Sequence, residues 1–537
     1  MFLKKIEIEK YKVLENISIN FEEKQNHNFF PVISVNGGGK STLLQFIFTF
    51  LHCSFVEKRQ KYLKTLLEYY QEFTSKDKIN KIAKFEIEHE KQIINLEFHY
   101  CKSVSKNFNS IITLKELLER KKNIEKAVLD IELLNRIEND LKNSNISPLL
   151  AWQELYKFRE IISVPHENSS ANISEMVYYI NKIRKNFENS LISDFDLNTL
   201  IIKEEAEKNK LVAELEKENL GYVFHFNKNN DVLLFKSNVN QDVLVDISEK
   251  IYLATPNTQV LHFFESEQLS SLFKKDLSIY STYEYYLRKC QEEVKGLFTY
   301  EFSAINLILE ALQKARDDDF KKALETGSYG TQINTTLKEL NNLLSGKSIT
   351  IDNNFEGVTF MTTNTKITLT PKDLSNGELK KLSIYIWLKA KTNNNSLILM
   401  DEVDMGLHPT WQHELYNDLQ KWSVGNQFII ATHSPQIISK AHYKNLVVIK
   451  HTETGATSEQ YHQPPLESDL NTIVKTIMGS DYIPKELLEL RKEYRKLFEN
   501  DKLETDEAKE IKKQILVYES ENSSFFQDIK FQMELRR

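Results

Sequence analysis

The stretch that decides the fold is residues 29–42, which read FFPVISVNGGGKST. The apolar run from Phe29 to Val35 predicts a buried strand, and the residues from about Lys40 to Cys53 predict a helix. A glycine-rich turn between a strand and a helix presents backbone N–H groups and a helix N-terminus to phosphate. The sequence therefore predicts a phosphate-binding P-loop, with a glycine-rich turn before a core helix as the alternative.

Each residue type in this P-loop has a predicted chemical role. Lys40 is expected to reach the β- and γ-phosphates, and the Ser41 hydroxyl is expected to ligate Mg²⁺. Ser34 stands where the usual motif begins with glycine. ATP and Mg²⁺ are therefore the expected cofactors. The candidate ATP-binding residues are Asn36, Gly37, Gly38, Gly39, Lys40, Ser41 and Thr42.

Two further apolar runs end in chemically useful side chains. Residues 396–402 read SLILMDE, so a buried strand would deliver Asp401 and Glu402 to its carboxyl edge. Asp401 is expected to hold Mg²⁺ through water, and Glu402 to polarise the attacking water as general base. A third run, residues 428–434, reads FIIATHS and ends beside His433. The predicted catalytic residues are Glu402, Lys40 and His433, and the predicted metal ligands are Ser41 and Asp401.

Residues 374–378 read LSNGE and resemble the signature L-S-G-G-Q/E of the ABC-type ATPases at four of five positions. The departure is Asn376. The resemblance implies that the signature caps ATP held by a second subunit, so a homodimer or higher oligomer is expected. It also implies that His433 contacts the γ-phosphate. The proposed signature residues are Leu374, Ser375, Asn376, Gly377 and Glu378. The residues that resemble the D-loop of RecF and SMC proteins are Asp404, Gly406, Leu407, His408 and Pro409.

Composition narrows the class of protein. Only 14 glycines and 10 prolines occur in 537 residues, which favours long helices over a turn-rich sandwich or propeller. Three widely spaced cysteines argue against a disulfide scaffold or a cysteine zinc site. The net charge of −7 argues against a generally basic nucleic-acid coat but allows a local basic groove. No targeting signal or membrane segment is recognised, so a cytoplasmic protein is expected.

The predicted fold is an α/β ATPase head of the ABC type, with a mixed sheet around a P-loop core, a helical insertion and a helical C-terminal tail. The head would comprise residues 1–102 and 348–464, separated by a helical insertion at 103–220 and a lid at 221–347. Residues 465–537 form the tail. Gln259 is the candidate Q-loop glutamine, with an ordinary loop glutamine as the alternative. The helical spacing of apolar residues in the tail predicts either a partner-docking face or packing on its own domain.

As a whole, the chain is similar to PtuA, the ATPase family of Septu-type and retron-linked anti-phage systems, in its length, the size of its insertion and its short helical tail. This resemblance implies a separate HNH-type nuclease partner, and it leaves open a retron reverse transcriptase with its RNA and DNA. A RecF-like DNA-repair clamp that acts on nucleic acid without a nuclease partner is the first alternative. A stand-alone nuclease with an unrecognised site is the second.

Overall fold

The structure is a computed structural model of the 537-residue chain, and it divides into two compact units. Unit 1 comprises Met1–Cys53, Phe85–Ile93 and Asp242–Arg537, and unit 2 comprises Ser54–Lys84 and Ile94–Gln241. The structure describes residues 1–21, 28–34, 37–71, 79–102, 109–143, 145–155, 158, 173–191, 197–217, 220–225, 231–264, 268–269, 279–301, 304–351, 357–453, 455–460, 472–478 and 483–536.

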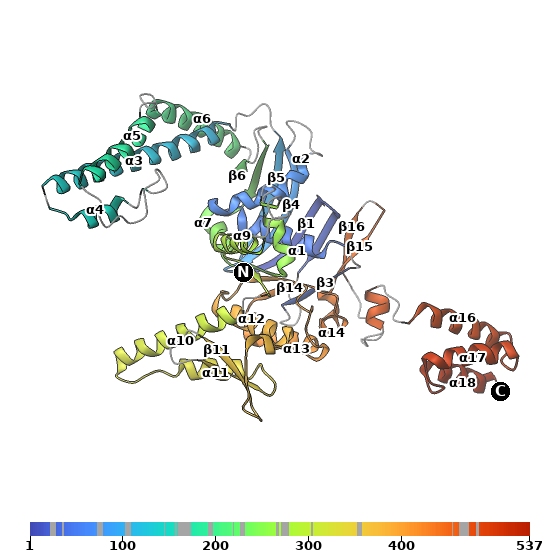
Figure 1. Ribbon diagram of the computed structural model, residues 1–537. Coiled ribbons are helices and arrows are strands. Elements are labelled where there is room, and N and C mark those ends of the chain that lie inside the picture. The colour runs from blue at the N-terminus through green and yellow to red at the C-terminus, as the bar shows by residue number, and fades with distance from the viewer. Residues whose placement is uncertain are drawn as a thin grey trace. The chain divides into compact units, whose positions relative to one another are not determined.

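Unit 1 is built on a mixed sheet with the strand order β4-β1-β2-β16-β15-β3-β14-β13-β8-β9 (Figure 1). Its strands from β15 to β9 in that order are parallel. The pairs β1–β2 and β15–β16 are antiparallel. The strand bounds are β1 Phe2–Tyr11, β2 Leu14–Asn20, β3 Phe29–Ser34, β4 Ile79–His89, β8 Ile251–Thr255, β9 Leu297–Thr299, β13 Leu397–Asp401, β14 Gln427–Ala431, β15 Val447–His451 and β16 Ala456–Gln460.

The parallel strands are buried on both faces, and this follows from their sequence. Every residue of β3, β8, β13 and β14 is buried, and each strand is a nearly continuous apolar run. Such runs are typical of parallel strands that helices cover on both sides. Because the strands are parallel, their carboxyl ends lie at one edge of the sheet, where the following turns can meet.

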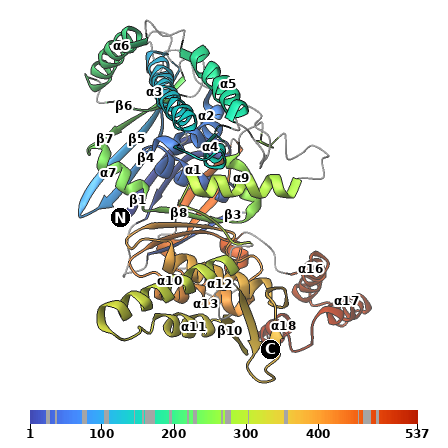
Figure 2. The same cartoon turned by 60° about the vertical axis from the view of Figure 1, so that its left-hand side comes forward.

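Helices and a small second sheet complete unit 1. Helix α1 follows β3 and contacts β8, β13 and β14. Helices α10 to α13 and the antiparallel sheet β10-β11-β12 lie next to the parallel strands (Figure 2). Their apolar side chains form one hydrophobic core with those of the parallel strands. The bounds are α1 Lys40–Cys53, α7 Gln241–Ser248, α9 Ile279–Glu293, α10 Ala304–Thr326, α11 Gln332–Asn341, β10 Lys347–Ile351, β11 Val358–Thr362, β12 Thr368–Leu369, α12 Asn376–Ala390, α13 Pro409–Trp422 and α14 Pro435–Ile438.

Unit 2 combines sheet strands with the long helices of the insertion. Its strand order is β6-β7-β5-β4, and α3 lies beside both α5 and α6 (Figure 1). Buried side chains of α3, α4 and α5, among them Leu134, Ile137 and Ile180, form a core of their own. The bounds are α2 Leu63–Gln71, β5 Gln92–Lys102, α3 Asn109–Lys142, α4 Pro148–Leu155, α5 Ile173–Leu191, α6 Leu197–Lys217, β6 Gly221–His225 and β7 Asp231–Ser237.

The C-terminal tail is helical, as predicted. After a π-helical turn at Ile473–Ile477 come α16 Lys485–Glu499, α17 Asp506–Tyr518 and α18 Ser524–Arg536. Apolar residues of these three helices, including Leu487, Tyr494 and Ile515, pack into a core of their own. The prediction of an α/β head with a helical insertion and a helical tail is therefore confirmed.

Two simpler expectations concern cysteines and membranes. The three cysteines, Cys53, Cys101 and Cys290, are buried thiols that form no disulfide. Within the part of the chain that the structure describes, no helix combines the length and the hydropathy needed to span a bilayer.

Candidate functional site

The P-loop joins β3 to α1 through glycines in a conformation that other residues rarely adopt. Gly37 has φ +76° and Gly39 has φ +94°. A Cβ at Gly39 would lie 2.8 Å from a methyl of Leu14 and 2.9 Å from one of Val13, so a side chain there would also require these two residues to move. Asn36 lies outside the described residues. The turn thus delivers Lys40 and Ser41 to the first turn of α1.

Ser34 has a structural reason to differ from the usual glycine. It is the last residue of β3, where it pairs in register with Ile449 of β15. Its hydroxyl accepts a hydrogen bond from Lys40 Nζ at 3.0 Å, and its carbonyl lies 3.3 Å from the same ammonium. Burial lowers the pKa of Lys40, while Asp401 and Glu402 act in the opposite direction. Serine therefore gives the buried ammonium neutral partners.

Asp401 meets Ser41 at the carboxyl edge of the sheet. The Ser41 hydroxyl donates to Asp401 Oδ1 at 3.0 Å, although the two residues are far apart in the sequence. Asp401 is 1% exposed, and burial raises its pKa to about 6 against the opposing hydrogen bond from Ser41. Its Oδ2 atom is buried and accepts no hydrogen bond from the residues that the structure describes. A buried carboxylate with a vacant oxygen beside a hydroxyl fits a cation.

The protein ligands near Asp401 fit magnesium held partly by a nucleotide. Among the described residues, no group of three or more His, Cys, Asp or Glu side chains could form a metal site. Mg²⁺ is usually bound by one or two carboxylates together with substrate phosphates and water. The pair of Ser41 and Asp401 suits that mode, and it does not suit a metal site made by protein alone.

Glu402 follows Asp401 in a left-handed conformation, with φ +49°. Its N–H donates to the Ala431 carbonyl at 3.1 Å, which ties the turn to the end of β14. In the next strand-end turn, the Thr432 hydroxyl donates to Asp404 Oδ1 at 2.8 Å. Burial, and then the nearby Lys40 charge, lower the pKa of His433. His433 is exposed and lies within electrostatic range of Lys40.

Gln259 lies beside the P-loop helix. It follows β8, and its Oε1 atom accepts a hydrogen bond from Gln45 Nε2 at 2.9 Å. Gln45 is four residues after Ser41 on α1, so both project from the same side of that helix. The structure thus places Gln259 close to the candidate site, while its role as a Q-loop residue stays a prediction.

The predicted signature forms the start of α12. Ser375 is the N-cap, and it exchanges hydrogen bonds with Glu378 in a capping box. Lys347 donates to both carboxylate oxygens of Glu378, at 2.9 and 2.7 Å. Leu374 is buried in the core, whereas Ser375 and Asn376 are exposed. The buried residues Leu374 and Glu378 thus fix the shape of the motif, and the exposed Ser375 and Asn376 leave the helix N-terminus open to solvent.

The predicted D-loop packs directly against this signature. A Cβ at Gly377 would lie 2.8 Å from the Gly406 carbonyl, so only glycine allows the two segments to approach so closely. The side chain of Gln412 donates to the carbonyls of Asp404 and Leu407. His408 caps α13, and Pro409 is its first residue. The structure brings the two motifs together in one chain.

Sequence reasoning missed several residues that support these motifs. The most central is Lys380 of α12, which donates to the main-chain carbonyls of Glu402 and Met405. Lys347 and Gln45 were also missed. A lysine in an otherwise buried helix face was the available signal for Lys380, but its partners are set by tertiary contacts. The partners of Lys347 and Gln45 carry no local signal.

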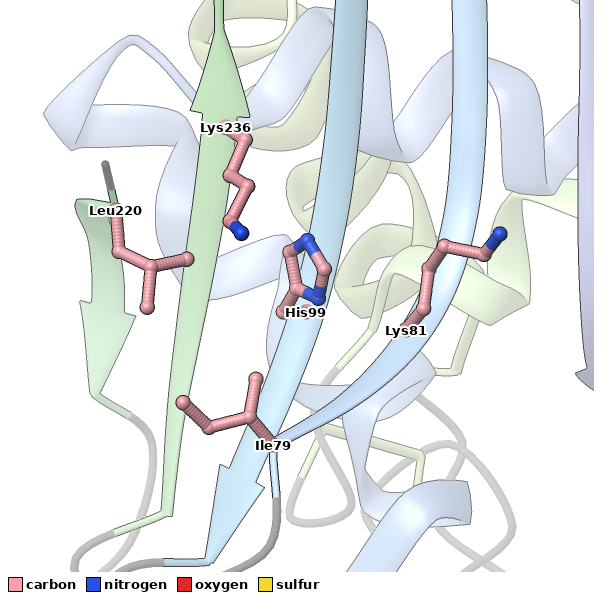
Figure 3. Close-up of a pocket in the computed structure, with 5 residues that line it drawn as sticks. All are labelled: Ile79, Lys81, His99, Leu220 and Lys236. Atoms are coloured by element: carbon pink, nitrogen blue, oxygen red, sulfur yellow. The ribbon is translucent and has the colours of Figure 1, made fainter. Parts of the chain in front are cut away.

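Unit 2 contains a separate surface hollow, shown in Figure 3. It is lined by Ile79, Lys81, His99, Leu220 and Lys236. His99 Nε2 lies 3.6 Å from a carboxylate oxygen of Glu97 on the same strand. None of the predicted site residues lines this hollow.

Comparisons with known proteins identify a family and several relatives of this chain. A family model described as "AAA domain, putative AbiEii toxin, Type IV TA system" matches residues 35–439. The "Retron Vc95 probable ATPase" of Vibrio cholerae serotype O1 is 28% identical over 131 residues, which cover 24% of this chain and 25% of the relative. The "DNA repair protein RecN" of the same serotype is 30% identical over 130 residues, covering 24% and 23%. The matches thus span about a quarter of the length of each relative.

Solved structures were also found that align with most of this chain. The "SMC head domain from Thermotoga maritima" aligns with 86% of this chain and 100% of its own, at 9% sequence identity and a TM-score of 0.35.

Proposed function

The chain belongs to the family described as "AAA domain, putative AbiEii toxin, Type IV TA system", and from this membership we propose that it is an ATPase that binds ATP and Mg²⁺ at the P-loop of unit 1. The observation that carries the proposal is the hydrogen bond from Ser41 to Asp401, whose buried Oδ2 atom accepts none from the described residues. Buried carboxylate oxygens normally have a partner, so this atom is suited to bind a cation.

In the proposed site each residue acts on a defined part of the nucleotide. The P-loop N–H groups and Lys40 bind the phosphates, and the ammonium leaves Ser34 to do so. Ser41 and Asp401 would hold Mg²⁺, which neutralises phosphate charge during phosphoryl transfer. Glu402 accepts the proton of the attacking water. The exposed imidazole of His433 donates a hydrogen bond to the γ-phosphate.

We propose that a second copy of the chain completes the site. The hydrogen bonds that the Ser375 hydroxyl makes among the described residues both go to Glu378, and the side chain remains exposed at the helix N-terminus. Such a terminus attracts phosphate oxygens. ATP bound to one protomer would thus meet the signature of its partner, which makes the dimer depend on ATP.

We further propose that the ATP cycle controls a separate effector, and an HNH-type nuclease in anti-phage defence is the candidate. The likeness to a retron ATPase over a quarter of each chain supports this proposal. The similar likeness to RecN supports the alternative, a DNA-repair ATPase that acts without a nuclease partner. The narrower assignment to the PtuA type, with or without a retron module, belongs to the same proposal.

The test uses Glu402→Gln, which keeps the side-chain volume and removes the base. We expect ATP binding to persist while turnover falls by about 100-fold or more, trapping an ATP-dependent dimer that size-exclusion chromatography detects. Adding Ser375→Arg should remove that dimer without loss of ATP binding. Turnover within a few-fold of the unmodified protein would refute the general-base role.

The same trapped protein, purified from its native host with a tag, distinguishes the two biological proposals. Co-purification of a small HNH-type protein, identified by mass spectrometry, would support effector control. Co-purification of DNA alone would favour the repair ATPase.

A further inference from the structure

A buried lysine contacts the candidate catalytic turn from the signature helix. Lys380 is only 9% exposed, and its ammonium donates to the carbonyls of Glu402 and Met405, each at 3.0 Å. The ammonium also lies 4.0 Å from the ring centroid of Tyr300. Two carbonyls and an aromatic face can therefore accept its three N–H groups.

The surroundings keep this ammonium in place. The charges of Asp404, Glu301, Glu402 and Asp401 act to raise its pKa, and burial outweighs them and lowers the pKa to about 8. The Tyr300 hydroxyl donates to the Ala254 carbonyl at 3.1 Å, which fixes the ring under the lysine. A buried lysine with this set of partners is held in one geometry.

Glu402, whose carbonyl accepts a hydrogen bond from Lys380, has an unfavourable backbone conformation. Glu402 has φ +49°, a region that non-glycine residues occupy only when surrounding contacts enforce it. Its N–H is held by Ala431, and its carbonyl accepts from both Met405 N–H at 3.2 Å and Lys380. The direction of the Glu402 carboxylate depends on this backbone, because φ and ψ set the direction of the Cα–Cβ bond.

We propose that Lys380 is a positioning residue for Glu402: its ammonium clamps the carbonyls of Glu402 and Met405 and so aims the Glu402 carboxylate at the attacking water. This inference rests on the proposed ATPase function and adds a residue to it. Lys380 touches no substrate, so its loss should impair the chemical step and leave nucleotide binding to the P-loop intact.

The neighbouring lysine provides a matched control. Lys381 lies on the same helix, pairs with Asp418 at 3.3 Å and lies 5.0 Å from the Trp411 ring centroid. Among the described residues, these contacts do not include Glu402. Lys380→Met and Lys381→Met therefore remove the same charge from adjacent positions and differ in whether the clamp is lost.

The first experiment measures ATP affinity by calorimetry and the rate of phosphate release for both variants. We expect Lys380→Met to lower kcat at least tenfold while Kd for ATP stays within threefold. Lys381→Met should leave both within twofold of the unmodified protein. Lys380→Arg, whose guanidinium can donate to two carbonyls, should recover most of kcat. Equal effects of the two methionine variants, or a loss of ATP affinity in Lys380→Met, would overturn the proposal.

A second measurement tests the clamp without turnover. Hydrogen–deuterium exchange in the nucleotide-free protein should become at least tenfold faster at the Met405 amide in Lys380→Met and stay unchanged in Lys381→Met. Unchanged exchange in both would refute the clamp. Absence of ATP hydrolysis by the unmodified protein would instead refute the proposed function. If Lys380→Met fails to fold, Lys380→Gln, which keeps an N–H donor without the charge, replaces it in both measurements.

Discussion

Two carboxylates, Asp401 in unit 1 and Glu138 in unit 2, have opposite surroundings. In unit 1, Asp401 has a raised pKa and, among the described residues, an Oδ2 atom without a hydrogen bond, and the hydrogen bonds of Lys40 in the same part of the chain go to the neutral oxygens of Ser34. In unit 2, Glu138 of α3 accepts hydrogen bonds from Arg184 of α5 and from Lys142, and these bonds lower its pKa.

The opposite pKa shifts of Asp401 and Glu138 distinguish a carboxylate suited to bind a ligand from one that makes a structural contact. The ion pair of Glu138 with Arg184 joins α3 to α5. An unsatisfied buried charge such as that of Asp401 destabilises the ligand-free protein, and a ligand that supplies the missing partner relieves this. The three predictions below test the contrast, beginning with the largest expected effect.

Lys40→Ala should affect nucleotide binding most. Loss of the charge-assisted contacts to the phosphates should weaken ATP affinity at least about 100-fold, measured by calorimetry. Lys142→Ala, in the paired cluster of unit 2, is the control and should leave ATP affinity unchanged. Equal ATP affinity in Lys40→Ala and the unmodified protein would remove the basis for the P-loop assignment.

Asp401→Asn should stabilise the ligand-free protein. The folded-state pKa of about 6 lies above the ordinary aspartate pKa of 3.8, so ionisation of Asp401 opposes folding. Removing the charge should raise the free energy of unfolding by up to about 3 kcal/mol above pH 6. The gain should shrink as the pH falls from 6 towards 4, where the aspartate is neutral in the folded protein. Denaturant unfolding at pH 8 and pH 5 checks this, and a less stable variant at pH 8 would contradict it.

Glu138→Gln should have the smallest effect and the opposite sign. Its partners favour the ionised form, so the substitution should lower the free energy of unfolding by about 1 kcal/mol at pH 7. Because the pKa of Glu138 is lowered, this contribution is present above the ordinary glutamate pKa and disappears in acid. ATP affinity should not change. A stabilising effect at pH 7, measured by denaturant unfolding, would show that the pair does not hold the helices.

Much of the site was predictable because its signals are local. An apolar run followed by glycines, lysine and serine encodes a strand, a turn and a helix within 25 residues, and the structure has β3 and α1 there. The carboxylates Asp401 and Glu402 were predictable in the same way, because they follow a buried apolar strand. The roles of these residues, of the signature and of the D-loop rest on the proposed function.

Other parts of the site depended on contacts between distant segments. The sequence shows a lysine at position 380, but not that its ammonium reaches two carbonyls in the turn after β13. The same holds for Lys347 with Glu378 and for Gln45 with Gln259. Ser34 looked like a departure from the motif, and its contact with Lys40 explains it.

The sequence by itself determined which segments become buried parallel strands and which side chains stand at their ends, because hydrophobic pattern and turn chemistry act within a few residues. Only the tertiary structure decided which of those side chains meet. The order of strands in the sheet places Ser41 beside Asp401 and α12 beside Glu402. Strand order is a property of the packed chain, so the vacant carboxylate oxygen and the lysine clamp could be seen only there.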